Sequence, residues 1–326
     1  MWRCRFLSLL ALPVLAPLAL LSPQAFSQQP QQAAQPASAN LPAPKADPKA
    51  AQALQKAIDQ LDSKKVGWLQ LTLAQKLTVW QQLASPGLTY QAEGDYLSGP
   101  NQCLRLNLKI RLGGLNAETT TVSDGTILWT AVTSAGQPRT VTKWSLKEIQ
   151  QALSNPNMMP QLRESFYQSQ CFSGIVPILE NMRQQMVVTK QESLQWQGHD
   201  VLKLTAVWNA EITKELMPAG GSNTWPTLVP HECRLLLDAK TYWPYRLEWW
   251  GPVTPGGPDV LVMETEYRDP HMIKTGDKPP EQYARAFVFD PGTDKVSDET
   301  KGFLESFKPF ISQQPPDSGK GTAPKK

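Results

Sequence analysis

Two stretches of alternating apolar and polar residues constrain the fold of this chain more than any other feature. Residues 104–112 read LRLNLKIRL, with leucine or isoleucine at every second position. Residues 233–251 read CRLLLDAKTYWPYRLEWWG, two alternating runs separated by a turn that ends at Pro244. Successive side chains of a strand point to opposite sides of a sheet, so this pattern predicts antiparallel strands with one buried face.

Similar runs recur along the chain and predict a sheet of about ten strands, most of them joined by hairpins. Ser123-Asp124-Gly125 is a hairpin turn signal, and Gln197-Gly198-His199 separates two further runs. The predicted strands cover residues 88–97, 104–112, 118–122, 126–132, 187–196, 200–208, 233–238, 245–251, 260–267 and 285–289.

Helical spacing of apolar residues occurs in two regions. Residues 48–83 show it throughout, with Gly67 as a break between two helices. In the middle of the chain Ser145 and Glu148 form a capping box, and two short helices are expected at 159–167 and 175–186. The simplest architecture is an α+β fold, in which an antiparallel sheet curls around a few helices and its other face is solvated.

The two ends of the chain have compositions that exclude them from a folded core. Residues 1–27 combine two early arginines with an apolar run and the small-residue cleavage site Ala25-Phe26-Ser27, which predicts a secretory signal peptide cleaved near Ser27/Gln28. The alternative is that this segment is retained as a membrane anchor. Residues 28–49 and 311–326 predict a disordered leader and tail, which leaves one domain at 50–310. Export predicts a periplasmic or secreted protein.

Charge and cysteine content exclude some classes of protein. Cleavage removes two of the 32 Lys and Arg residues and none of the 29 Asp and Glu, so the mature chain is nearly neutral and we expect no nucleic-acid partner. Export permits a disulfide among Cys103, Cys171 and Cys233, with the pair left open; Cys103 and Cys233 are alternatively plain core residues. The absence of a CxxC motif or a Cys/His cluster predicts no metal site.

No sequence motif indicates an enzyme. GxSxG, HExxH and phosphate-loop patterns are absent from the sequence. His231 and Cys233 make a poor catalytic pair, because Cys233 alternates with leucines on a buried face. Glu264 and Glu266 share the polar face of a strand, where solvated carboxylates are more common than acid–base pairs. We therefore expect neither catalytic residues nor a cofactor.

A row of basic residues occupies the polar face of the 104–112 strand. Arg105, Lys109 and Arg111 alternate with the leucines and isoleucine of that strand. Such a row suits lipid headgroups or an acidic partner, but it is more often the wet side of a sheet.

The order of these parts resembles the periplasmic lipoprotein carrier family with the LolA-like and LolB-like fold. The resemblance is carried by LRLNLKIRL, the hairpin SDGTILW at 123–129 and the helical insert between two sheet halves. It continues in LLLDAKTYWPYRLEWWG, VLVMETEYRDP and ARAFVFDPGTDKVSD, and covers roughly residues 50–300. The chain departs from the family at its buried arginine, since Arg105 lies on the polar face, and in a longer insert at 210–230.

The resemblance implies an unclosed β-barrel covered by helices, with a hollow that holds acyl chains. It further implies a monomeric, non-enzymatic carrier or sensor of acyl lipid or lipoprotein, which meets an envelope acceptor protein or a membrane surface. A hollow lined by large apolar side chains suits this role, because each buried methylene contributes about 0.8 kcal/mol. The alternative is a filled core, which makes the chain a structural or interaction module of the cell envelope. The expected lining residues are Leu106, Leu108, Trp129, Leu204, Leu235, Leu237, Leu247, Trp249, Met263 and Phe287.

Overall fold

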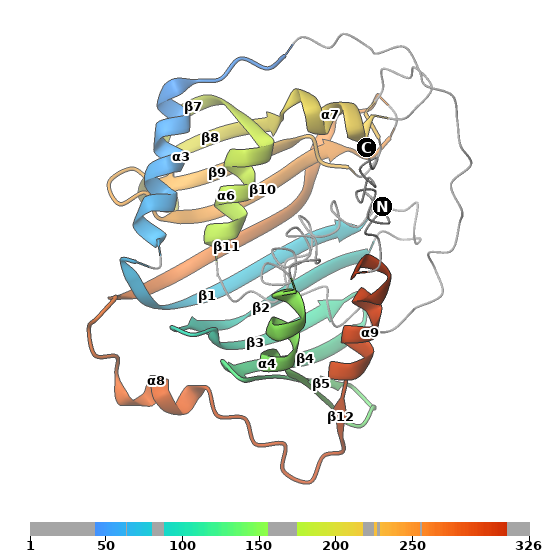
Figure 1. Cartoon of the computed structure of the whole chain (residues 1–326). Helices are drawn as coiled ribbons and strands as arrows, with labels where there is room; N and C mark the ends of the chain where they lie inside the picture. Colours follow the sequence, from blue (N-terminus) through green and yellow to red (C-terminus); the bar gives the residue numbers. More distant parts are fainter. Residues whose placement is uncertain are drawn as a thin grey trace, which may run out of the picture.

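The structure is a computed structural model that describes residues 43–62, 64–79, 88–155, 175–217, 225–226, 229–254 and 256–311. Within these residues the strands form one 12-stranded sheet, ordered β12-β6-β5-β4-β3-β2-β1-β11-β10-β9-β8-β7. Its two edge strands lie at opposite ends, so the sheet is curved but not closed (Figure 1). The unclosed sheet covered by helices, expected from the sequence, is confirmed.

The chain builds the sheet in two halves. The first comprises β1 (Val66–Val79), β2 (Leu88–Ser98), β3 (Cys103–Leu112), β4 (Leu115–Asp124), β5 (Ile127–Ser134) and β6 (Thr140–Ser145). The second comprises β7 (Met186–Trp196), β8 (His199–Trp208), β9 (Glu232–Asp238), β10 (Pro244–Pro252) and β11 (Asp259–Lys274). β11 pairs antiparallel with β1 and joins the halves, while the short β12 (Val296–Asp298) pairs parallel with β6.

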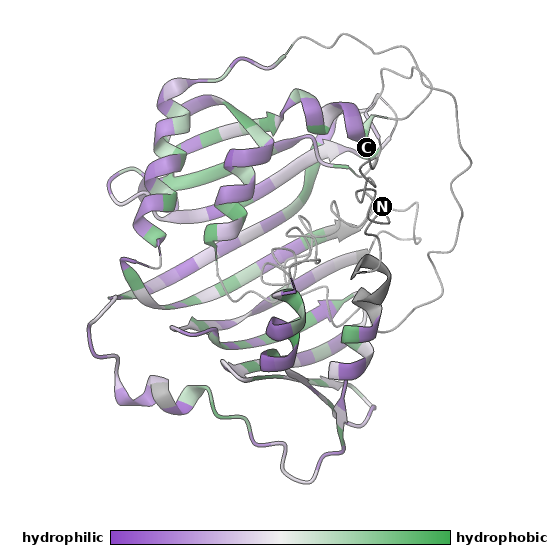
Figure 2. Ribbon diagram, in the orientation of Figure 1, coloured by the Kyte–Doolittle hydropathy of each residue, from purple (hydrophilic) through white to green (hydrophobic). Residues whose placement is uncertain are grey.

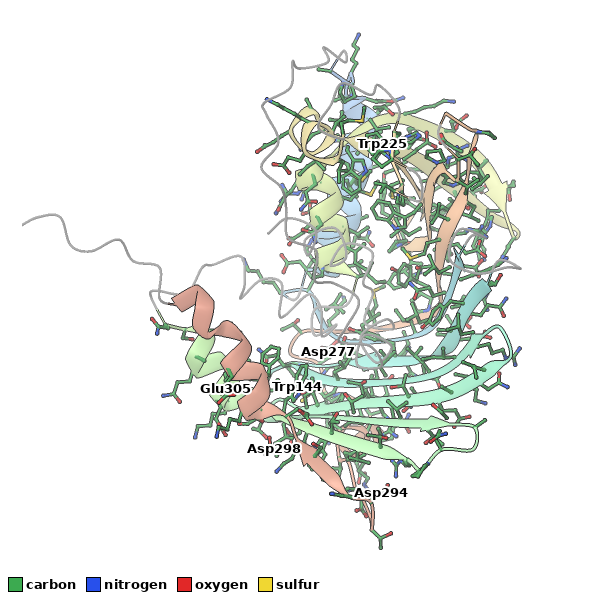
Figure 3. All side chains as sticks on the ribbon, turned by 90° about the vertical axis from the view of Figure 1, so that its right-hand side faces the viewer. Trp144, Trp225, Asp277, Asp294, Asp298 and Glu305 are labelled. Atoms are coloured by element: carbon green, nitrogen blue, oxygen red, sulfur yellow. The ribbon has the colours of Figure 1, made fainter. Side chains whose placement is uncertain are left out.

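The described helices that cover the concave face of the sheet lie in two groups (Figure 1). α3 (Pro48–Leu61) packs on α6 (Val176–Gln185), and both contact β7, while α7 (Ala210–Leu216) contacts β8. At the other end, α4 (Leu146–Leu153) and α9 (Thr300–Ile311) pack on each other and on β6. Figure 2 shows hydrophobic and hydrophilic residues alternating along the strands beneath them. The buried apolar side chains of α3, α4 and α6 belong to the same hydrophobic cluster as those of the strands, so the inner face of the sheet is the apolar one.

The outer face is covered in part by the segment that joins β11 to β12. This segment contains α8 (Glu281–Ala286) and contacts outer-face side chains of β1 and β3. Phe287 packs its ring against Trp68, with centroids 5.7 Å apart, and Arg105 donates a hydrogen bond to the carbonyl oxygen of Ala286 at 3.0 Å. The expectation that this face is solvated is therefore correct only for the strands that α8 leaves uncovered.

The helix expected over 48–83 ends at Leu61, and the rest of the described region is the long strand β1. Leu69, Leu71 and Leu73 are all buried on one side, which is strand periodicity. β1 is hydrogen-bonded along both edges, to β2 and to β11. These long-range pairings outweigh the local helical spacing that the sequence offers.

The strand expected at 285–289 is also wrong. These residues include the end of α8 and an irregular segment after it. Phe287 and Phe289 alternate because both rings pack down onto the outer face, against Trp68 and Trp129, and not because they belong to the sheet. β1, β6 and β12 replace this strand and account for the larger sheet.

Other expectations are confirmed or lie outside the described residues. Ser145 caps α4, its hydroxyl accepting a hydrogen bond from the backbone of Glu148, and the helix expected at 175–186 is α6. The helix at 159–167, the signal peptide, and most of the leader and tail fall outside the described part of the chain. Among the helices that are described, none has the length and apolarity that a bilayer crossing requires.

Candidate functional site

Most of the expected lining residues come together on the inner face of the sheet. Leu106 and Leu108 lie on β3, and the others lie on β8 to β11. All of them belong to one hydrophobic cluster, and none is more than 3% exposed. The residues placed together are Leu106, Leu108, Leu204, Leu235, Leu237, Leu247, Trp249 and Met263.

Trp129 and Phe287 lie on the other face. The ring of Trp129 stacks on Phe289, with centroids 5.3 Å apart. Phe287 forms a separate small cluster with Leu97 and Tyr283 under α8. The sheet separates these two residues from the other predicted lining residues, so they form part of a different surface.

The inner face is continuous across both halves of the sheet. The strand register places apolar residues side by side from β3 through β2, β1, β11, β10, β9 and β8 to β7. One such row consists of Leu112, Tyr90, Leu77, Met263, Trp249, Cys233, Ala206 and Val188. The unclosed sheet thus presents a single apolar surface about eight strands wide, in which neighbouring strands are about 4.8 Å apart.

The helices over the β7–β11 end bury few large side chains against this surface. α3 buries Leu54, Ile58 and Leu61 beside three alanines, α6 buries Leu179 and Met182, and α7 buries none of its residues. Fully burying one such large side chain contributes about 1.5–3 kcal/mol. This part of the helical cover is therefore held by few strong contacts, which is typical of segments that open locally.

Two polar side chains lie within the apolar inner face. Gln75 on β1 is 5% exposed and Thr265 on β11 is fully buried. The Gln75 amide nitrogen donates to the Thr265 hydroxyl at 3.3 Å and reaches the Met263 sulfur at 3.7 Å. Both are long contacts, so the amide of Gln75 has weak partners for a buried donor.

Among the described residues the indole N–H of Trp249 has no hydrogen-bond acceptor, although it is buried on the inner face. Two other buried tryptophans do have acceptors for their indole N–H groups. Trp208 donates to the carbonyl of Pro230 at 2.7 Å, and Trp243 donates to the carbonyl of Tyr267 at 3.1 Å. Trp208 and Trp249 stack, with ring centroids 5.7 Å apart. A buried donor left without an acceptor costs about 1–3 kcal/mol.

Charged residues gather on the outer face and pair with each other. Arg246 contacts Glu248, Glu264 and Glu266, at 2.7, 2.5 and 3.1 Å. A groove of about 550 Å³ lies beside this network over β11, β1, β2, β3 and β4, lined by residues of both signs. Glu264 and Glu266 thus occupy the polar face, as expected, and are held in ion pairs.

The basic residues of β3 lie in two different environments on the outer face. Arg105 lies against the α8 segment through its bond to Ala286, whereas Lys109 and Arg111 line the outer groove. Lys109 stands opposite Glu93 on β2 and Glu118 on β4. The row is therefore neutralised in part by its neighbours on the sheet.

The cysteines show no activated thiol within the described residues. Cys103 and Cys233 are both free, and Cys171 lies outside the described part of the chain. Burial raises the pKa of the Cys233 thiol well above its ordinary value, and the nearby carboxylates of Glu248 and Glu232 raise it further. His231 contacts Asp259 at 2.9 Å. A thiolate nucleophile is disfavoured at Cys233.

Gln75 was not among the expected site residues, because the apolar spacing around it also predicts a helix. The signal was present: Leu69, Leu71, Leu73 and Leu77 alternate with small or polar residues, and Gln75 occupies the apolar phase of that alternation. The missing acceptor of Trp249 has no sequence signal, since it depends on which carbonyls lie near each indole.

Comparisons with known proteins give structural likenesses only. No protein-family model matches the chain, and no curated protein matches it. Among solved structures, LprF from Mycobacterium bovis is 10% identical with a TM-score of 0.32, and the match covers 72% of this chain and 96% of that one. A DUF1329 family protein from Desulfovibrio piger is 8% identical with a TM-score of 0.25, over 70% and 95% of the two chains.

A LolA superfamily protein from Nitrosomonas europaea also matches, with 12% identity and a TM-score of 0.21, over 71% of this chain and 94% of that one.

Proposed function

We propose that the inner face binds the acyl chains of a lipid or lipoprotein, and that the protein is a non-enzymatic carrier or sensor of such molecules in the periplasm or outside the cell. The continuity of the apolar face from Leu112 on β3 to Val188 on β7 carries this proposal. An extended hydrocarbon chain has the apolar chemistry that matches a continuous apolar surface of this kind.

The mechanism is shielding of the chain from water. Acyl methylenes replace contacts now made by the covering helices, each contributing about 0.8 kcal/mol. α6 holds the sheet mainly through Leu179 and Met182, so its displacement removes few contacts. Contact with an acceptor protein or a membrane surface would reverse the exchange and release the cargo.

The burial of the middle of the inner face favours a second function. Leu204, Leu235 and Leu237 have no exposed surface. If the helices do not move, the sheet has a filled core and the chain acts as an interaction module of the cell envelope. Uptake of lipid distinguishes the two functions.

The test titrates delipidated protein with a fluorescent long-chain fatty acid and compares two adjacent substitutions. Leu237→Glu places a charge on the inner face, and Leu236→Glu places one on the outer face, where Leu236 is also buried. Both variants lose stability from a buried charge. Folding of each is checked by circular dichroism before titration.

The proposal expects uptake by the wild type and by folded Leu236→Glu, with loss of uptake in Leu237→Glu. Wild-type protein that takes up no fatty acid or lipopeptide supports the filled core. Should Leu237→Glu not fold, Leu237→Ala replaces it and is expected to change the affinity, while Leu236→Ala leaves the affinity unaltered.

A further inference from the structure

We propose that the indole N–H of Trp249 binds the carbonyl oxygen of an acyl ester, so that the inner face selects ester-linked lipids over hydrocarbons and ether-linked lipids. This inference rests on the proposed function and names the chemical class of its ligand. It starts from the one unusual feature of Trp249, a buried indole donor for which the described part of the chain provides no acceptor.

The neighbouring tryptophans show that the fold can satisfy such groups. Trp208, which stacks on Trp249, and Trp243 each donate to a backbone carbonyl. Trp225 does the same, to the carbonyl of Val229 at 2.6 Å. Trp249 differs from these three tryptophans in lacking an acceptor, and we attribute the difference to its position on the apolar surface.

A second donor lies next to Trp249 on the same surface. Met263 pairs with Trp249 across β10 and β11, and the amide nitrogen of Gln75 reaches the Met263 sulfur at 3.7 Å. Gln75 occupies the next row of the sheet, opposite Thr265. Two N–H donors therefore flank the Met263 side chain: the indole of Trp249, which has no acceptor among the described residues, and the amide of Gln75, whose acceptors are distant.

These donors select the ligand group that accepts hydrogen bonds next to a hydrocarbon chain. An ester carbonyl has two acceptor lone pairs and adjoins the first methylene of an acyl chain. The surrounding row of Leu77, Met263 and Cys233 is apolar and suits that chain. None of these three described side chains could serve as the counterion of a charged headgroup, so the recognised atom is the neutral carbonyl oxygen.

The experiment measures binding of a diacylglycerol and of the dialkylglycerol with identical chain lengths, which lacks both carbonyls. Wild type, Trp249→Phe and Trp208→Phe are compared. Trp208→Phe is the matched control, because it removes an indole N–H that already has an acceptor from the same stacked pair.

We expect wild type to bind the diester about fivefold more tightly than the diether, which corresponds to about 1 kcal/mol for one hydrogen bond. Trp249→Phe loses this preference and Trp208→Phe keeps it. Unfolding curves give a second readout: Trp249→Phe loses less stability than Trp208→Phe, since no satisfied bond is broken.

Each other outcome is decisive. Equal binding of the two lipids by wild type overturns the ester selection and leaves acyl-chain binding intact. A preference that persists in Trp249→Phe overturns the assignment to Trp249. Absence of binding of either lipid to wild type overturns the proposed function itself, and the ester selection with it.

Discussion

Arg246 on β10 and Glu264 on β11 form an ion pair on the outer face, with Nη2 2.5 Å from Oε2. The same guanidinium also contacts Glu248 and Glu266, so one cation holds three carboxylates on two strands. The pairing of β10 with β11 is thus fixed from the outer side by charge, while the inner side of the same strands is apolar.

Replacement of Arg246 by methionine is expected to lower the free energy of unfolding by about 3 kcal/mol, because the partly buried carboxylates of Glu248 and Glu264 lose their counterion, while Glu266 keeps Arg268. Urea denaturation measures the loss. Arg139→Met is the control: its pair with Asp294 is more exposed, so the expected loss is about 0–1 kcal/mol. Equal losses in the two variants would contradict this account of the network.

Leu247→Ala and Phe287→Ala distinguish the two faces of the sheet. Both residues are buried, and each truncation is expected to cost about 2–5 kcal/mol in urea denaturation. Only Leu247→Ala should alter fatty-acid affinity, because Phe287 lies under α8 on the outer face. An equal change of affinity in Phe287→Ala would show that the outer cluster takes part in binding.

Gly94→Ala is expected to destabilise the protein by more than about 3 kcal/mol, or to prevent folding. A Cβ at Gly94 would lie 1.8 Å from the carbonyl oxygen of Asn107 on the neighbouring strand. A Cβ at Gly114 meets nothing within 4 Å, so Gly114→Ala should be close to neutral in thermal unfolding. A tolerated Gly94→Ala would mean that β2 and β3 are further apart than described.

Asp238→Ala tests a pH-dependent turn. Burial raises the pKa of Asp238, but hydrogen bonds from the backbone of Thr241 and Lys240 and from the Thr241 hydroxyl outweigh it, so the net pKa lies below its ordinary value of 3.8. A lowered folded-state pKa stabilises the fold above the unfolded pKa, and this stabilisation is lost as pH falls through the folded value.

The variant should therefore be less stable than wild type by about 1 kcal/mol at pH 7, and the difference should shrink below about pH 4. Urea denaturation at a series of pH values measures it. A difference that stays constant down to the most acidic pH at which wild type folds would contradict the role of the carboxylate.

The strands with clean alternation were predictable from the sequence, because their periodicity agrees with the tertiary structure. LRLNLKIRL is β3, and the two runs around Pro244 are β9 and β10. β1 was not predictable, because its leucines also fit helical spacing. Only its pairing with β11, which is distant in sequence, decides between a helix and a strand. α8 and Phe287 were missed for a similar reason, because alternation does not distinguish a strand from a segment packed on a sheet.

The candidate site was predictable only as a set of apolar side chains on one face. Leu204, Leu235 and Leu247 follow directly from strand alternation. Trp129 alternates in the same manner but belongs to the outer face, because the phase of β5 relative to its neighbours is set by the β4–β5 register. The hydrogen-bonding state of Gln75 and Trp249 could not be predicted, because it depends on which acceptors the fold places beside each side chain.

Native mass spectrometry of the protein purified from its own periplasm, followed by organic extraction, tests the central claim most directly. We expect a co-purifying acyl lipid or lipopeptide, whose mass identifies the cargo and whose removal leaves protein that takes it up again. A single mass equal to the bare chain, together with no uptake of added lipid or lipopeptide, would contradict acyl-chain binding and leave the inner face as a filled core.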